Sequence, residues 1–88
     1  MSSIIEESEL GVHIYPNPSN GKVTIDWTAR AAVEIAVSNL LGEVVWQEKL
    51  KSTQFSQTVD LSTQPSGVYL VHVKADSESV TKRIVLNR

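Results

Sequence analysis

Apolar and polar residues alternate along short stretches of the chain, which is the period of two expected of half-buried β-strands. The alternation is cleanest over Lys22–Trp27 and Ala31–Ser38, and it returns over Gln54–Leu61. Val, Ile and Thr, whose branched β-carbons favour strands, supply 24 of the 88 residues. No stretch of about 11 residues carries the spacing of an amphipathic helix, so the pattern predicts strands throughout.

Four further segments show weaker strand patterns: Val12–Tyr15, Glu43–Leu50, Gly67–Ala75 and Glu78–Asn87. In the second, three successive apolar residues, Val44–Trp46, leave open which face turns inward. The third is apolar on both faces at its start, which predicts a central strand covered on both sides. The fourth is interrupted by Lys82, and an inward-pointing lysine commonly protects an edge strand from pairing with other chains.

Turn signals separate these segments, because proline fixes φ and Asn-Gly accepts positive φ. They occur at Pro16–Gly21, Asn39–Gly42, Ser62–Gly67 and Asp76–Ser77. Short strands with a turn about every 8–12 residues and no helix predict an all-β fold, an immunoglobulin-like antiparallel β-sandwich of about seven strands. Residues 1–11 are expected to be a flexible leader or linker, and residues 12–88 the domain.

Composition narrows the function classes. Eight Lys and Arg against ten Asp and Glu give a net charge of −2, which does not supply the basic stripe that nucleic-acid binding requires. The absence of cysteine excludes disulfides, Cys-ligated zinc and thiol nucleophiles. No run approaches the roughly 20 apolar residues of a transmembrane helix, and the first residues lack a secretory signal. Taken alone, the chain would stay in the cytoplasm; if it is a fragment, an export signal would lie upstream.

Catalytic and metal-binding chemistry finds little support in the sequence. The two histidines, His13 and His72, lie inside strand patterns and are expected to pack or face solvent, since a zinc site needs three or four converging ligands. None of the 11 serines lies in a nucleophile-elbow motif. Calcium binding through a loop aspartate stays open, although the regular aspartate spacing of a calcium loop is missing. The sequence therefore predicts a non-enzymatic domain without a metal or cofactor.

Aromatic residues leave a second interpretation open. Trp27, Phe55 and Tyr69 fall on apolar faces and are expected in the core. Tyr15 and Trp46 have no clear facing, and an exposed pair would form a platform on which sugar rings stack. An accessory module that binds carbohydrate, or a passive spacer in a surface enzyme, is therefore the alternative function.

Four motifs in a fixed order cover most of the chain. They are Tyr15–Pro18 with Gly21, then Val37–Val45, then Val59–Ser62 with Pro65–Val71, and finally Thr81–Leu86. In order and spacing they resemble the C-terminal sorting domains of the type IX (Por) secretion system of Bacteroidetes. The chain departs from that family at Asn39, where aspartate is usual, and at Gln64-Pro65, which stands near a usual leucine.

The resemblance implies a function that composition does not show. Such domains form the C-terminal end of larger secreted proteins, with which they are covalently continuous. The cargo reaches the periplasm with an N-terminal signal peptide, and the folded domain then guides it through the outer-membrane translocon to the cell surface or the medium. In many members a sortase-like surface protease removes the domain. The resemblance thus implies a non-catalytic secretion signal whose partners are this translocon and this protease.

The motif residues divide into two groups. Those expected to hold turns or, for the tyrosine, the core are Pro16, Asn17, Pro18, Asn20, Gly21, Gly42, Gly67 and Tyr69. The terminal strand is the candidate recognition site for the translocon or sortase, because a receptor can add a strand to an exposed edge. Its residues are Lys82, Arg83, Ile84, Val85 and Arg88. An equal alternative is that these charges only guard the edge, and self-association by edge pairing also stays open.

Cleavage by a protease requires an extended, unfolded segment. It is therefore expected in the leader, around Ser8, Glu9, Leu10 and Gly11 or upstream of them. A sorting signal would also lose its function when residues are added after Arg88 or when the last strand is removed. A passive spacer would tolerate both changes.

Overall fold

The computed structural model describes residues 10–76 and 78–87 of the chain. These residues form seven strands, and every predicted strand is present with its ends shifted by at most two residues. The strands are β1 (His13–Tyr15), β2 (Lys22–Asp26), β3 (Val33–Asn39), β4 (Val44–Leu50), β5 (Ser56–Asp60), β6 (Gly67–Ala75) and β7 (Glu78–Leu86).

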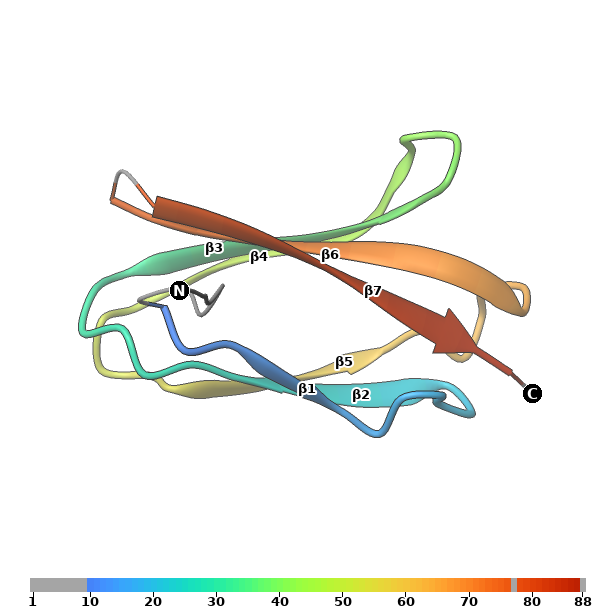
Figure 1. The fold of residues 1–88 in the computed structure, drawn as a ribbon, viewed down its shortest axis with the longest axis horizontal. Helices are drawn as coiled ribbons and strands as arrows, with labels where there is room; N and C mark the ends of the chain where they lie inside the picture. The colour runs from blue at the N-terminus through green and yellow to red at the C-terminus, as the bar shows by residue number, and fades with distance from the viewer. Residues whose placement is uncertain (1–9, 77, 88) are drawn as a thin grey trace, which may run out of the picture.

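The strands form two sheets that pack face to face, as Figure 1 shows. One sheet has the order β1-β2-β5 and the other the order β4-β3-β6-β7. All the pairings within them are antiparallel. The predicted all-β, seven-strand antiparallel sandwich is therefore confirmed.

The hydrophobic core lies between the two sheets. Residues paired across a ladder point to the same face, and the pairs Val23–Val59 in one sheet and Val37–Val71 in the other are all at most 1% exposed. β6 is central in its sheet, as predicted, but its outer-face residues Val68 and Leu70 are only half-buried. The expectation that both faces of this strand are covered is therefore wrong.

A bulge in β4 explains why the facing of Val44–Trp46 was ambiguous in the sequence. Val37 pairs with Trp46, whereas the next residue, Ser38, pairs with Val44, so that Val45 is the extra residue of a β-bulge. The bulge lets Val45 and Trp46 both pack against the core. Val44 instead points outward and is 55% exposed.

Two of the three aromatic residues expected in the core are buried, and the third is not. Trp27 and Tyr69 are 2% and 4% exposed, whereas Phe55 is 43% exposed. The expectation for Phe55 is wrong because β5 begins only at Ser56, so the alternation of that strand does not govern the residue before it. The Phe55 carbonyl nevertheless accepts a hydrogen bond from the Trp27 main-chain N–H at 3.0 Å.

The folded domain begins earlier than the sequence pattern indicates. Leu10 is 3% exposed, and its carbonyl accepts a hydrogen bond from the Thr28 main-chain N–H at 2.9 Å. Gly11 has a φ of 60°, and a Cβ atom there would collide with the Thr28 hydroxyl, so only glycine fits without strain. Leu10 and Gly11 therefore belong to the sandwich, whereas Ser8 and Glu9 lie outside the described residues.

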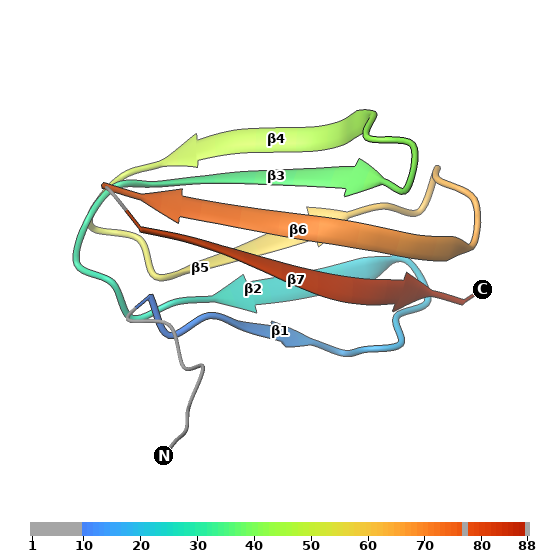
Figure 2. The ribbon, with the colours of Figure 1, turned by 45° about the horizontal axis from the view of Figure 1, so that its top comes forward.

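The two ends of the described chain lie at opposite ends of the sandwich (Figure 2). Leu10 lies beside the connection from β2 to β3, which we call the leader end. β7 finishes beside the connection from β1 to β2, where Ser19 forms a parallel bridge with Leu86. The β3–β4 hairpin and the β5–β6 connection share this second end, which we call the motif end.

Candidate functional site

The turns of the first three sequence motifs and the end of the fourth converge at the motif end. The segment 16–21, the hairpin 39–43, the connection 61–66 and the end of β7 all lie there (Figure 2). They are separated by up to 70 residues in the sequence, so no local pattern brings them together. They meet because successive strands run in alternating directions and these connections fall at the same end. This end is the candidate functional site.

The first and last motifs are in direct contact through Asn17. Its side-chain amide donates a hydrogen bond to the Arg83 carbonyl at 3.3 Å, and its side-chain carbonyl accepts one from the Val85 main-chain N–H at 3.0 Å. The Asn17 side chain thus occupies the place that the peptide group of a neighbouring strand would take. It was expected only to hold a turn, and no signal in the local sequence reveals this contact.

Ser19 continues the same contact with its main chain. Its N–H donates to the Val85 carbonyl at 2.9 Å, and its carbonyl accepts from the Asn87 N–H at 2.8 Å. Its buried hydroxyl donates to the Lys22 carbonyl at 2.7 Å and accepts from the Gly21 N–H at 3.0 Å. The segment Asn17–Ser19, which we call the edge clip, therefore covers one half of the free edge of β7.

The other half of this edge carries main-chain groups that point away from the sheet. In an antiparallel ladder, the main-chain N–H and C=O groups of every second residue point to the same edge. Those of Arg83, Val85 and Asn87 point outward and meet the edge clip. Those of Thr81 and Ser79, earlier in β7, point outward in the same way. Among the described residues, the clip contacts reach no further along β7 than the Arg83 carbonyl. We call Ser79–Arg83 the open edge.

The β3–β4 hairpin presents two apolar side chains to solvent at the motif end. Asn39 holds its backbone, since the side-chain carbonyl accepts hydrogen bonds from the Leu41 and Glu43 N–H groups at 2.9 and 3.0 Å. Its side-chain amide also donates to the Glu43 carboxylate at 2.8 Å. Leu40 and Leu41 are 67% and 85% exposed. The hairpin is therefore a rigid turn with an apolar tip, and asparagine serves as well as the usual aspartate because the acceptor oxygen is retained.

Tyr69 fixes the third motif through a tyrosine corner, the arrangement found near the start of the equivalent strand in immunoglobulin-like domains. The buried ring carries a hydroxyl that donates to the Pro65 carbonyl at 2.7 Å, four residues upstream. The departure from the usual sequence at Gln64-Pro65 leaves this bond intact, because its acceptor belongs to the main chain.

Asp60 stabilises the start of the connection between β5 and β6. Its carboxylate accepts a hydrogen bond from the Ser62 main-chain N–H at 2.9 Å. Hydrogen bonds from the Ser62 side chain and main chain hold the pKa of Asp60 below its usual value. The Leu61 N–H meanwhile donates to the Gly21 carbonyl at 2.7 Å, which ties this connection to the first motif.

A protein-family model matches most of the chain. The model of the secretion system C-terminal sorting domain matches residues 13–87. The chain belongs to this family. As a type IX sorting domain, it directs export across the outer membrane to the cell surface or the extracellular space.

The solved structures support the fold of the sorting domain. A crystal structure of a DUF3244 family protein from Bacteroides vulgatus, described as an immunoglobulin-like β-sandwich, superposes with a TM-score of 0.77. The two proteins share 14% sequence identity, and the match covers 88% of this chain and 85% of that chain. At this identity the likeness shows the fold alone. No curated protein matches the sorting domain.

The structure separates the recognition residues predicted for the sorting domain. Lys82 and Arg83 are exposed on opposite faces of β7, because the register places Lys82 beside the buried Val71. Val85 is half-buried beside the edge clip. Ile84 is 0% exposed, so its side chain contacts no partner while the domain is folded. Arg88 lies outside the described residues.

The two aromatic residues of the alternative interpretation do not form one platform. Tyr15 is 49% exposed on β1 of the smaller sheet, and its hydroxyl donates to the Asp26 carboxylate at 2.7 Å. This hydrogen bond raises the pKa of Tyr15 above its usual value. Trp46 belongs to the larger sheet and packs against the core. Since they lie on different sheets, a shared sugar-stacking surface is not present.

The histidines and acids among the described residues do not form a metal-ligand cluster. Among residues 10–76 and 78–87, no three His, Asp or Glu side chains gather as metal ligands do. His72 instead bridges two hydroxyl groups on the outer face, with its ring nitrogens 3.2 Å from Ser38 Oγ and 3.0 Å from Thr81 Oγ1. The described part of the chain also contains no helix long and apolar enough to span a membrane.

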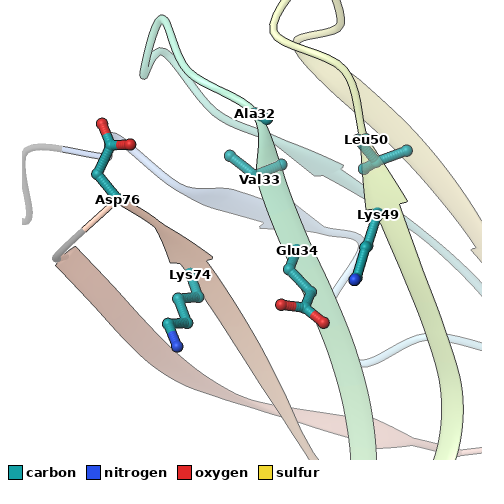
Figure 3. A pocket seen from close by; sticks show the side chains of 7 residues that line it. All are labelled: Ala32, Val33, Glu34, Lys49, Leu50, Lys74 and Asp76. Atoms are coloured by element: carbon teal, nitrogen blue, oxygen red, sulfur yellow. The ribbon is translucent and has the colours of Figure 1, made fainter.

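A depression of about 260 Å³ is lined by residues at the leader end, and Figure 3 shows its side chains. Three of its charged side chains come from neighbouring strands, with Lys49 and Lys74 on the strands either side of Glu34, and Asp76 follows the end of β6. Opposite charges placed across strands stabilise a sheet surface. Because the depression shares no residue with the four motifs, it is not part of the candidate site.

Proposed function

We propose that this sorting domain is a non-catalytic address label that remains folded while the type IX translocon recognises it. The observation that carries the proposal is the convergence of three motif turns and the end of β7 on the motif end, at the opposite end of the sandwich from Leu10. A cargo joined through the leader would emerge from the leader end. The motif end would therefore remain accessible to a receptor whatever the size of the cargo.

We propose that the translocon or sortase contacts exposed side chains at this end and in the middle of β7. Lys82 and Arg83 are the charged candidates, and Leu40 and Leu41 on the hairpin are the apolar ones. Binding energy in protein interfaces concentrates in a few anchor residues. A rigid hairpin lowers the entropic cost of presenting such anchors.

We further propose that removal of the domain occurs on the N-terminal side of Leu10. A protease must accommodate an extended segment in its active site, and Leu10 is buried with its carbonyl bonded to Thr28. Of the predicted cleavage residues, this leaves Ser8, Glu9 and positions before them. Mass spectrometry of the secreted cargo is expected to find its new C-terminus there, and a terminus within the sandwich would contradict the proposal.

The decisive experiment transfers the domain to a reporter. Residues 8–88 are fused to the C-terminus of a periplasm-targeted fluorescent protein and expressed in a Bacteroidetes host with and without a working type IX translocon. Export only in the intact host supports the sorting role, and export should be lost when β7 is removed or when residues are added after Arg88. A folded reporter that stays in the periplasm of both hosts contradicts it.

A charge reversal tests the contact residues. Lys82→Glu with Arg83→Glu is expected to block secretion of the reporter while leaving its melting temperature close to that of the parent, because both side chains are exposed. The matched control is Arg30→Glu with Lys51→Glu, an equal reversal at two exposed residues outside the strands. Normal secretion of the first variant, or equal loss in both, would refute a specific role for Lys82 and Arg83.

A further inference from the structure

The open edge of β7 offers main-chain hydrogen-bonding groups that an extended peptide matches. The edge clip shows how such an edge is satisfied: Asn17 and Ser19 supply donors and acceptors to Arg83, Val85 and Asn87 in the positions of a neighbouring strand. Beyond the clip, the same outward pattern continues through Thr81 and Ser79. An unpaired row of this kind is a template for one more strand.

The positive charges on the open edge determine which kind of partner strand can pair with it. Lys82 lies on the inner face beside Val71, and its neighbour Arg83 lies on the outer face. Neither takes part in an ion pair with another described residue. Glu78 shares the inner face with Lys82 but lies four residues away, about 13 Å along the strand, so it does not neutralise this charge.

An inward lysine opposes the addition of an apolar strand, because pairing would bury its ammonium group. An added strand with a carboxylate beside Lys82 removes this penalty. Alternate side chains of an added strand lie on opposite faces, so acidic residues on both faces would meet Lys82 and Arg83 together. The lysine that prevents pairing with apolar strands would therefore favour pairing with acidic ones.

We propose that the open edge, Ser79–Arg83, binds an extended acidic segment of a partner protein as an added β-strand. This inference rests on the proposed function, since it names the partner chemistry by which the folded domain would be recognised. Main-chain hydrogen bonds to Ser79, Thr81 and Arg83 supply the affinity, and the two cations supply the selectivity.

The test titrates the isotope-labelled 88-residue domain with a capped seven-residue peptide, three consecutive glutamates flanked by two threonines on each side, so that glutamates lie on both faces of the added strand. Binding is expected to slow hydrogen exchange of the Ser79, Thr81 and Arg83 amides at least tenfold at saturation. A peptide with lysine in place of glutamate is expected to bind several-fold more weakly, as is usual for exposed charge pairs. The same glutamate peptide with alternate amides methylated is expected to lose binding, because it cannot complete the ladder.

Two variants make the result specific to this edge. Lys82→Glu with Arg83→Glu should reverse the preference, so that the lysine peptide binds more tightly than the glutamate peptide. Asn17→Ala removes the two side-chain bonds of the clip to Arg83 and Val85 and should extend the slowed exchange to the Val85 amide. Protection at other strands, equal binding of both peptides, or unchanged binding after methylation would each overturn the proposal.

This test and the reporter experiment fail independently. A reporter that is exported by a domain that binds no glutamate peptide would refute strand addition and leave the sorting role standing. A domain that binds the peptide through the open edge but does not export the reporter would refute the sorting role and leave the acidic-strand site standing.

Discussion

The tyrosine corner offers the sharpest test of how the third motif stabilises the domain. Tyr69→Phe removes one oxygen atom and with it the 2.7 Å hydrogen bond to the Pro65 carbonyl, while the ring stays in place. Tyr69 is only 4% exposed and its hydrogen bond is partly buried, although Pro65 itself is exposed, so water replaces the lost hydroxyl less readily here than at an exposed side chain. Tyr15→Phe makes the same chemical change at a side chain that is 49% exposed.

The expected cost follows from the burial of the bond. A neutral hydrogen bond contributes about 1 kcal/mol to the free energy of unfolding, and more when its acceptor is left buried without a partner. In a domain of this size, about 1 kcal/mol lowers the melting temperature by about 4–8 °C. At Tyr15, water replaces the lost contact with Asp26, so the melting temperature should change little.

Thermal unfolding followed by circular dichroism, with both variants measured beside the parent, checks this difference. Chemical denaturation gives an independent value, because the denaturant midpoint should fall with an unchanged slope. A Tyr69→Phe domain that melts within about 1 °C of the parent would show that the corner adds no net stability. Equal losses in both variants would show that burial does not set the cost.

Three further predictions concern other parts of the domain. Gly11→Ala should destabilise more than Gly42→Ala in thermal unfolding, because both glycines have positive φ but only the first would place a Cβ against another side chain; equal losses would refute a steric cost. Because the pKa of Asp60 is lowered in the folded state, its hydrogen bonds to Ser62 stabilise the fold at pH values above the usual aspartate pKa of about 3.9. This contribution disappears as the pH falls through the folded-state pKa. In urea unfolding, Asp60→Asn should therefore have a lower free energy of unfolding than the parent at pH 7, and this difference should vanish in acid. A difference that does not depend on pH would contradict this. Leu41→Ser should leave the melting temperature unchanged yet reduce secretion of the reporter, since the side chain is 85% exposed; normal secretion would exclude the hairpin tip from recognition.

The strands could be predicted from the sequence because their burial is periodic, and periodicity is a local property. Where local geometry breaks the period, the prediction fails: the bulge at Val45 reverses the facing within β4, and Phe55 lies just outside its strand. The burial of Leu10 had a usable signal, because Leu10, Val12 and Ile14 continue the alternation of β1 towards the leader.

The candidate site was harder to predict than the fold, because its contacts are long-range. Asn17 and Val85 are 68 residues apart and meet through a side chain that imitates a strand. A Pro-Asn-Pro sequence predicts a turn equally well whether or not the asparagine reaches a second segment. The motif residues could be named from the sequence, but the contact that joins the first motif to the last follows only from the arrangement of the sheets.

The opposite placement of the leader end and the motif end has a mechanical consequence. A cargo held back at Leu10 while β7 is gripped would load the domain along its strands, with the force passing through the pairs of β1 and the bonds of the edge clip. Ladder hydrogen bonds lie across the strand direction, so a lengthwise pull strains them together instead of opening them one at a time. The sandwich would thus resist extraction of its first strand and act as a handle that transmits tension to the cargo before it unravels.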